Sequence, residues 1–474
     1  MNNYSKFLDK KIFNIVGKCA DKLNFETYVV GGWVRDLLMG RIKKNTDIDF
    51  VCVGSGIKLA EEVQNVLGKK AKFQVFKNFG TALVNLENEN YEFVGARSES
   101  YRKNSRKPII ENGTLHEDQV RRDFTINALA IRLNKKDYGK LIDPFNGKQD
   151  LIEQVIVTPL DPCKTFSDDP LRMMRAVRFA SELNFSIKKS ILGSIEKNRE
   201  RLSIVSQERI TDEFNKILLS KKPSIGLNLL FKTKLLHIFF NELVSLAGVE
   251  IKNNHAHKDN FKHTLQVLDN ISVYTDDLWL RWAALLHDIA KPITKKYEEG
   301  HGWTFHAHEY IGSKMVSNIF RKLKLPLNDK MKYVKKLVLL HLRPIILAKD
   351  IVTDSAVRRL LFDAGNDIDD LMLLCDADIT SKNKVKVLKY QNNFQLVRKK
   401  IKIVEEKDKI RNFQPPINGN EIIDLFEINE GKEIGVLKNA IKNAILDGNI
   451  KNNKIDALKF LKQKANELKI KSKL

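Results

Sequence analysis

The sequence is poor in cysteine and has no long uncharged run. It has 474 residues and four cysteines, which lie far apart and form no CxxC pair (Cys19, Cys52, Cys163, Cys375). This spacing argues against a disulfide framework or a cysteine-based zinc site, and it is typical of a reducing compartment. No stretch of about 18 residues lacks a charge, so a membrane-spanning helix is not expected.

The N-terminal segment lacks the features of a signal peptide. Lys10, Lys11 and Lys18 interrupt its apolar residues, and no convincing cleavage site follows. We therefore expect an amphipathic first helix and a cytoplasmic protein. Linkers rich in glycine, serine or proline and repeats of 20–50 residues are also missing, and a hydrophobic content of 43% excludes disorder throughout.

The charge is strongly basic. The formal net charge is +23 and the sequence pI is about 9.6, so the protein should attract polyanions such as nucleic acid. A biased genome composition is the alternative explanation, because lysine greatly outnumbers arginine and asparagine and isoleucine are also common.

The pattern of apolar residues changes near residue 150. Residues 25–55 read as strand, glycine turn, helix and strand, and further strand-like runs cover residues 73–76, 81–86 and 91–95. Residues 96–118 are polar and are expected to be irregular. After residue 150 apolar residues recur three and four apart. The fold class expected is therefore α+β, a mixed α/β head followed by an all-helical body.

Two aspartates in the head point to a metal site. Asp47 and Asp49 lie two apart in a strand-like run, so their carboxylates share one face and suit Mg²⁺. Upstream, Gly31 and Gly32 let a backbone approach phosphate, and Arg35 adds charge. This arrangement suits nucleotidyl transfer. Each feature alone is common on protein surfaces, and only their joint spacing is informative.

Five ordered segments carry a family resemblance. GGWVRDLLMGRIKKNTDIDF, RRDFTINALA, DPFNG, DDPLRMMRAVRFASELNF and ERITDEFNKIL resemble motifs A to E of the class II tRNA nucleotidyltransferases, which include bacterial CCA-adding enzymes and poly(A) polymerases. The resemblance covers residues 25–220. It implies a head of the polymerase-β type that uses Mg²⁺, CTP and ATP and acts on the acceptor arm and 3′ end of tRNA.

The resemblance also implies residue roles. Asp47 and Asp49 would be catalytic metal ligands, and the nucleotide would be bound by Gly32, Arg35, Arg122, Asp169, Arg172, Arg175 and Arg178. The family pattern Glu-Asp-x-x-Arg appears here with Asp168 in the first position. Without the resemblance, the alternative interpretation is a solvated basic helix face formed by Arg172, Arg175 and Arg178.

The physics of the Asp169 and Arg172 pair explains the expected selection of bases. C and A each present an amino donor beside a ring-nitrogen acceptor, whereas U and G place a carbonyl where the amino group should be. A carboxylate facing that carbonyl has no proton to share, and buried mismatches of this kind are rejected by up to about 10⁴-fold. One site could then serve both CTP and ATP without a nucleic-acid template.

The polar segment 96–118 resembles the flexible loop of the family. Enzymes of the family that add only CC typically lack or shorten this loop, so its presence favours addition of CCA or of A alone. A long disordered insertion is the alternative interpretation.

A second constellation resembles the HD metal phosphohydrolases. His263, His287, Asp288 and Asp378 are the expected ligands, with Asp376 as the competitor for the last position, and His308 and His341 add two further histidines. Imidazole with carboxylate suits a transition metal such as Mn, Ni, Fe or Zn. If active, the domain would hydrolyse phosphate esters of RNA ends or nucleotides; otherwise it is a scaffold for RNA.

The expected architecture has four parts. They are a nucleotidyltransferase head (1–150), a helical neck with base-reading and RNA-binding helices (151–250), an HD metal-binding domain (251–395) and a basic helical tail (396–474). We expect CCA addition to tRNA, no membrane and no obligate protein partner. The alternatives are a poly(A) polymerase, an A-adding enzyme, and an HD phosphohydrolase whose head only binds RNA.

Overall fold

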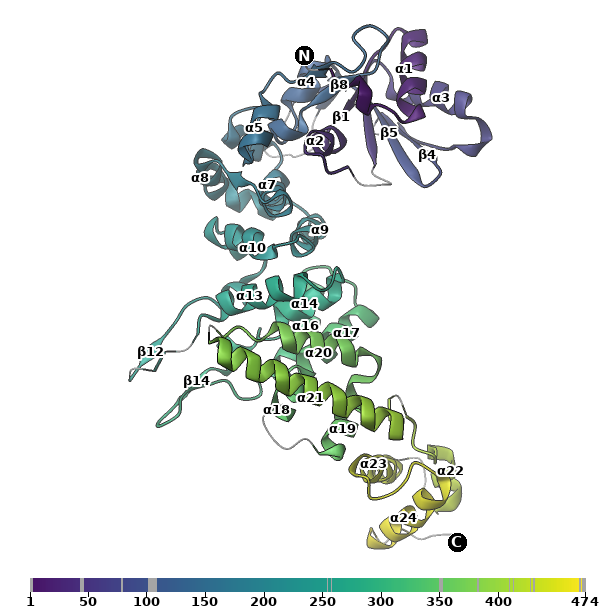
Figure 1. The fold of residues 1–474 in the computed structure, drawn as a ribbon, viewed down its shortest axis with the longest axis vertical. Coiled ribbons are helices and arrows are strands. Elements are labelled where there is room, and N and C mark those ends of the chain that lie inside the picture. Colours follow the sequence, from purple (N-terminus) through teal and green to yellow (C-terminus); the bar gives the residue numbers. More distant parts are fainter. Residues whose placement is uncertain are drawn as a thin grey trace. The chain divides into compact units, whose positions relative to one another are not determined.

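The chain forms two compact units, Met1–Asn241 and Glu242–Leu474 (Figure 1). The computed structural model describes residues 3–42, 47–77, 80–100, 109–253, 255–256, 258–348, 353–381, 383–408, 410–411, 413–426, 428, 431–468 and 470. Within the described residues, no helix combines the length and the apolar character needed to cross a membrane.

A seven-stranded sheet organises the N-terminal unit. The strand order is β3-β4-β5-β2-β1-β8-β9, and only β2 and β5 are parallel neighbours. The strands are β1 (Glu26–Val30), β2 (Ile48–Val53), β3 (Lys72–Phe76), β4 (Thr81–Leu86), β5 (Glu89–Gly95), β8 (Ala130–Arg132) and β9 (Leu141–Ile142). Phe50 of β2 is fully buried and stacks on Phe93 of β5, with ring centroids 5.0 Å apart. The predicted strand, turn, helix and strand of residues 25–55 are confirmed.

Helices cover the sheet and continue beyond it. The helices of this unit are α1 (Lys11–Leu23), α2 (Gly32–Leu38), α3 (Gly56–Leu67), α4 (Leu115–Val120), α5 (Gly147–Glu153), α6 (Pro162–Asp168), α7 (Leu171–Leu183), α8 (Lys189–Asn198), α9 (Gln207–Leu218), α10 (Pro223–Lys232) and α11 (Leu236–Phe239). Helix α7 packs against α9 and α10 and is buried along most of its length, as its apolar spacing predicts.

The segment 96–118 is more regular than expected. β6 (Arg97–Ser100) pairs with β7 (Ile109–Asn112), and α4 begins with a capping box in which Thr114 and Glu117 bond reciprocally. The expectation of irregular structure is therefore wrong for these residues. The remainder of the predicted loop, residues 101–108, lies outside the described residues.

The second unit is mainly helical. Its helices are α13 (Asn260–Ser272), α14 (Leu278–Leu286), α15 (Lys291–Thr294), α16 (His308–Lys322), α17 (Asp329–Leu340), α18 (Leu342–Leu347), α19 (Asp354–Ala364), α20 (Ile368–Ala377), α21 (Lys384–Asp408), α22 (Gly419–Leu425), α23 (Lys432–Asp447) and α24 (Lys454–Glu467), and α12 (Asn241–Val244) lies at the boundary. Two short hairpins join them, β12 (Ile251–Lys252) with β13 (His255–Ala256) and β14 (Lys296–Glu298) with β15 (Gly302–Thr304). Figure 1 shows both hairpins extending from the same side of this unit.

The predicted fold class is confirmed. A mixed α/β head precedes a helical body, and the described body adds only the two hairpins and one parallel pair, β10 (Val155–Ile156) with β11 (Ser186–Ile187). The structure divides into two units rather than four parts, so the finer boundaries at 150, 250 and 395 stay a prediction.

Candidate functional site

The sheet register places the predicted metal-binding aspartates beside the glycine turn. Asp49 of β2 lies opposite Val30, the last residue of β1, and Gly31 and Gly32 follow at once. Gly31 has a φ of +74°, and a Cβ there would lie 3.4 Å from Asp49 Oδ2 and 3.3 Å from Arg122 Nη1. Glycine therefore keeps open the space between a carboxylate and a guanidinium, as a bound phosphate with its metal requires.

The carboxylates of this edge influence one another. Burial raises the pKa of Asp49; the charge of Arg122 opposes this effect, and Asp47 adds to it. Glu92 of β5 is the register partner of Asp49, and its pKa is also raised, by burial and then by Asp49. Where burial and a neighbouring carboxylate raise the pKa of a carboxyl group, a bound cation stabilises its charged form. Glu92 is not among the residues predicted from the sequence, although it occupies a polar position in an alternating strand.

A cavity of about 670 Å³ joins the predicted residues of the head. Its lining contains all nine of the predicted catalytic and nucleotide-binding residues. The full lining is Gly31, Gly32, Arg35, Asp47, Asp49, Arg121, Arg122, Asp123, Asn127, Asp169, Arg172, Arg175, Arg178, Phe179 and Arg209. The lining therefore combines the carboxylates of β2 and the glycine turn with the arginines of α7.

A buried chain of hydrogen bonds connects α2 to α7. Arg35 Nη1 donates to Asn127 Oδ1 at 3.0 Å, and Asn127 Nδ2 donates to Asp123 Oδ1 at 3.1 Å. Arg175 Nε donates to Asp123 Oδ2 at 2.7 Å. The pKa of Asp123 is lowered although burial acts to raise it, because Arg175, Asn127 and Arg172 stabilise the carboxylate. Asp123 and Asn127 are not among the residues predicted from the sequence, although both lie in the RRDFTINALA motif.

The predicted base-reading pair lies at the start of α7. Arg172 Nη2 donates to the backbone oxygen of Arg121 at 2.6 Å, which orients the guanidinium within the cavity. Asp169 Oδ1 accepts from the backbone N–H of Leu171 at 3.2 Å. Since both side chains are tied to backbone groups, their positions are set before a nucleotide arrives.

Arg178 differs from the other arginines. Its Nε donates to Glu213 Oε2 at 2.5 Å and its Nη1 to Glu182 Oε2 at 2.9 Å. Because Arg178 is only 9% exposed, the alternative of a solvated basic helix face is wrong for this residue. Arg178 fixes α7 against α9, and its contact with nucleotide stays a prediction.

The Arg178 ion pair should contribute measurably to stability. We expect Glu213→Gln to lower the free energy of unfolding by about 3 kcal/mol, because a buried guanidinium loses its main partner. Urea titration measures this change. Glu200→Gln, at an exposed ion pair with Arg199, is the control and should cost less than about 1 kcal/mol. Equal effects of the two substitutions would contradict the assigned role.

The second constellation also comes together. His263 lies on α13, and the other predicted ligands stand at helix ends, with His287 and Asp288 after α14 and Asp378 after α20. His263 Nε2 lies 2.9 Å from Asp378 Oδ1, and His287 Nε2 lies 3.2 Å from Asp288 Oδ2. The structure thus groups all four predicted ligands. The competitor Asp376 lies outside the group, where it pairs with Arg398.

His308 and His341 extend this cluster. His308 Nε2 lies 3.3 Å from Asp288 Oδ1, and His341 Nε2 lies 4.0 Å from the same oxygen. Two groups result, His263 with His287 and Asp378, and His308 with His341 and Asp288. The two further histidines were noted in the sequence but were not included among the predicted ligands.

Backbone bonds orient three of these imidazoles. Nδ1 of His287, His308 and His341 lies 2.7–2.8 Å from the carbonyl oxygen three residues earlier, so Nδ1 carries the proton when the ring is neutral. Each Nε2 is then a lone-pair donor aimed at the cluster. Within the described residues, these three buried Nε2 atoms make no hydrogen bond of normal geometry, and each lies 3.2–4.0 Å from an oxygen of Asp288. The residues therefore fit a transition metal.

Three protein-family models match the chain. They describe a poly A polymerase head domain over residues 27–157, a probable RNA and SrmB-binding site of polymerase A over residues 184–246, and an HD domain over residues 260–383.

Curated relatives match over different lengths. A multifunctional CCA protein of Pseudomonas fluorescens (strain Pf0-1) is 33% identical over 321 residues, which cover 64% of this chain and 71% of the relative. An A-adding tRNA nucleotidyltransferase of Aquifex aeolicus is 45% identical over 163 residues, covering 34% of this chain and 19% of the relative. The chain matches less than half of the length of the Aquifex protein and also of a Halalkalibacterium halodurans A-adding enzyme, of which 46% is covered.

Solved structures share the fold. The Bacillus stearothermophilus CCA-adding enzyme in complex with CTP has a TM-score of 0.69 and 24% identity, covering 97% of this chain and 99% of that chain. The Thermotoga maritima CCA-adding enzyme complexed with tRNA has a TM-score of 0.60 and 24% identity, covering 98% of both chains.

Proposed function

Because the chain belongs to the family of CCA-adding tRNA nucleotidyltransferases and poly(A) polymerases, we propose that it adds CCA to the 3′ end of tRNA from CTP and ATP. The observation that supports this most directly is the single cavity that contains Asp47, Asp49 and the Asp169–Arg172 pair. That cavity would place a polymerizing site beside a protein-based reader of the incoming base.

The carboxylates of Asp47 and Asp49 in this cavity are suited to nucleotidyl transfer. Asp47 and Asp49 would hold Mg²⁺, which supplies charge neutralisation for the attacking hydroxyl and the pyrophosphate that leaves. The turn at Gly31 and Gly32 gives the triphosphate close access to the backbone, and Arg35 adds a positive charge. These groups would align the 3′ hydroxyl of the RNA with the α-phosphate.

The pair at the start of α7 is suited to choosing the base. Asp169 can accept from the amino group of C or A, while Arg172 donates to the neighbouring ring nitrogen. The network through Asn127, Asp123 and Arg175 would hold the start of α7 at a fixed distance from Arg35, so that either base meets the same contacts. The selection of two bases by one site follows from their shared hydrogen-bonding edge.

The test of the function is tRNA-dependent turnover. Purified full-length protein with Mg²⁺ should release pyrophosphate from CTP and ATP only when a tRNA lacking its 3′ CCA is present, and not from UTP or GTP. Pyrophosphate release without tRNA, or from all four nucleotides equally, would contradict the proposal. Turnover should weaken as salt rises, because the basic body would hold the acceptor arm by phosphate contacts.

A second activity is favoured by the metal cluster. We propose that the residues matched by the HD domain bind a transition metal and hydrolyse phosphate esters at RNA ends or in nucleotides. His263, His287, Asp288 and Asp378 would hold the metal. A bound metal supplies a water activated at neutral pH.

Removal of the charge of Asp288, the central carboxylate, should abolish most metal binding by this cluster. Asp288 lies within 4.0 Å of four histidines, so we expect Asp288→Asn to lower the content of bound Mn²⁺ at least about tenfold. Metal analysis after dialysis against Mn²⁺ and a chelator wash measures this content. Asp269→Asn, on α13 and outside the cluster, is the matched control. Equal metal content in the two variants would exclude the assigned ligand set.

Metal binding should depend on pH. Burial acts to lower the pKa of His287, but Asp288 and Asp378 raise it to about 10 in the metal-free protein. The ring is then protonated at neutral pH, and a metal must displace that proton. We therefore expect the affinity for Ni²⁺ to rise about tenfold per pH unit between pH 6 and pH 8. Calorimetry in buffers of different ionisation enthalpy measures the released proton, and a pH-independent affinity would contradict the assignment.

A further inference from the structure

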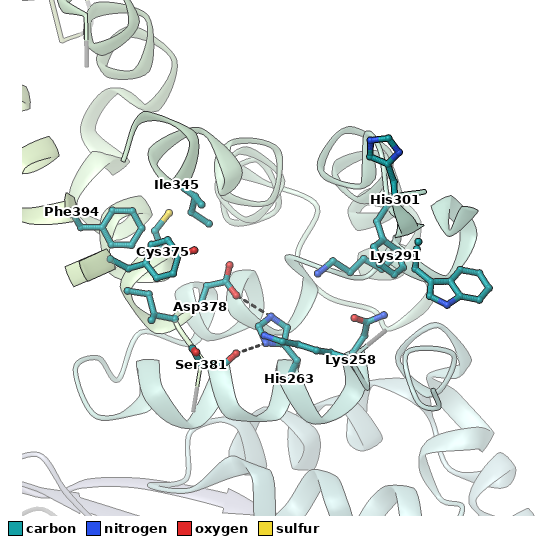
Figure 2. Close-up of a pocket in the computed structure, with 16 residues that line it drawn as sticks. Lys258, His263, Lys291, His301, Ile345, Cys375, Asp378, Ser381 and Phe394 are labelled. Carbon is teal, nitrogen blue, oxygen red and sulfur yellow. Dashed lines mark hydrogen bonds and ion pairs between the residues drawn. The ribbon is translucent and has the colours of Figure 1, made fainter. Parts of the chain in front are cut away.

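The metal cluster opens into a cavity of about 470 Å³ whose two sides differ in character. Figure 2 shows Ile345, Cys375 and Phe394 on one side of His263 and Asp378, and Lys291 and His301 on the other. The volume and the mixed lining are typical of pockets that bury an organic ligand rather than a simple ion.

The positive side is suited to a phosphate. Lys291 and Lys258 line the cavity together with His301, and Lys291 Nζ lies 2.6 Å from Asp288 Oδ2. A phosphate bound beside the cluster would meet these cations. This side alone would accept any phosphate ester.

Two aromatic rings, Trp303 and Phe305, also line the cavity, and Phe305 lies beside Lys291. The opposite side differs because its wall is apolar and aromatic without a lysine. It is formed by Ile345 of α18, Ile379 after α20, and Tyr390 and Phe394 of α21. Phe394 is only 1% exposed and forms a fixed base for this wall, while Tyr390 is partly exposed and lines the open cavity. Helix α21 begins at Lys384, so the aromatic wall lies beyond the residues 260–383 that match the HD domain.

Hydroxyl groups lie beside the cluster in the same cavity. Thr380 Oγ1 lies 2.9 Å from His263 Nδ1, and Ser381 lines the cavity next to it. A ligand that spans the cavity from Lys291 to the apolar wall therefore meets cations at one end, the cluster with its hydroxyl groups in the middle, and an aromatic face at the other end. A nucleotide presents phosphate, ribose and a flat base in that order.

We propose that the side of the HD cavity built by α21 is a subsite for a nucleobase, with Tyr390 as the stacking residue that selects nucleotide phosphates over other phosphate esters. This inference rests on the proposed HD activity. The ligand class is a nucleoside monophosphate, either free or at the 3′ end of an RNA. Aromatic faces stack on any base, so the subsite should discriminate little between bases.

The test separates metal, phosphate and base. Full-length protein loaded with Mn²⁺ is titrated calorimetrically with adenosine 3′-monophosphate and, separately, with inorganic phosphate. All proteins carry Arg172→Ala to weaken nucleotide binding in the head. Tyr390→Ala should bind the nucleotide about tenfold more weakly, with unchanged Mn²⁺ content and unchanged phosphate affinity. Tyr390→Phe should restore nucleotide affinity, and Tyr274→Ala, at an exposed tyrosine outside this cavity, is the control.

The outcomes are distinguishable. If Tyr390→Ala binds the nucleotide as tightly as the parent does while metal and phosphate bind normally, the base subsite is wrong. If the parent protein retains no Mn²⁺ or binds no phosphate, the proposed HD activity itself fails. A 3′-phosphorylated oligonucleotide that binds more tightly than the mononucleotide, with the same dependence on Tyr390, identifies an RNA end as the ligand. Tighter binding of the mononucleotide identifies a free nucleotide.

Discussion

Asp49→Asn is expected to reduce nucleotide incorporation at least about 10³-fold, which is the largest effect of any substitution considered. Asp49 lies in the register position next to the glycine turn, and its Oδ2 faces the space that Gly31 keeps open. The amide has nearly the same shape but carries no charge, so it can neither hold Mg²⁺ strongly nor compensate for Arg122.

The fold should survive this substitution. Burial already raises the pKa of Asp49, so a neutral side chain removes an unfavourable buried charge. The melting temperature should therefore stay the same or increase. Asp137→Asn, at an exposed ion pair with Lys140, is a matched control and should retain full activity. Normal nucleotide incorporation by the Asp49→Asn protein would show that the head does not catalyse the transfer.

Arg172→Ala is expected to lower discrimination against UTP and GTP by about 10²-fold or more. The guanidinium is oriented by the backbone oxygen of Arg121, and without it the ring acceptor of C or A loses its donor. The Kd for tRNA should change by less than about twofold, because the residue lies in the nucleotide cavity. Competition between correct and incorrect nucleotides in single-turnover incorporation measures this ratio.

A control separates base selection from general loss of charge. Arg199→Ala removes an arginine of the same unit that does not line the cavity and pairs with Glu200. It should leave discrimination unchanged. If Arg172→Ala preserved the preference for C and A while weakening tRNA binding, Arg172 would be a phosphate contact rather than a reader of the base.

Much of the head could be predicted from local patterns. The strand around Asp49, the glycine turn and the α7 motif are close in sequence or ordered along it, and alternation or helical spacing predicts each of them. The cavity confirms that these residues come together. Their individual roles stay predictions.

Long-range partners could not be predicted in the same way. Glu92 lies beside Asp49 only because β5 pairs with β2, and that pairing depends on the sheet order rather than on any local pattern. From the sequence alone, Arg178 is one of several arginines on the same face of a helix. Its partner Glu213 lies on a different helix, so the spacing within α7 cannot show that Arg178 is buried in an ion pair. The wall built by Tyr390 depends on how α21 packs after the HD domain, which helical periodicity alone does not determine.

The choice of Asp378 over Asp376 shows the same limit. Both aspartates lie at the end of α20, two residues apart; Asp378 is the ligand expected from the sequence, but no local pattern excludes Asp376. Only the helix geometry directs Asp378 to His263 and Asp376 to Arg398.

The central claim is that one protein site selects C and then A and stops after CCA. The most direct measurement is 3′-end extension by the purified protein with Mg²⁺, using tRNA transcripts that end before CCA, after C and after CC, with CTP, ATP or both. With both nucleotides present, the account predicts that each transcript is completed to CCA and then extended no further. Addition of A to the CC-ended transcript alone, an unending A tail, or no incorporation on any transcript would contradict it.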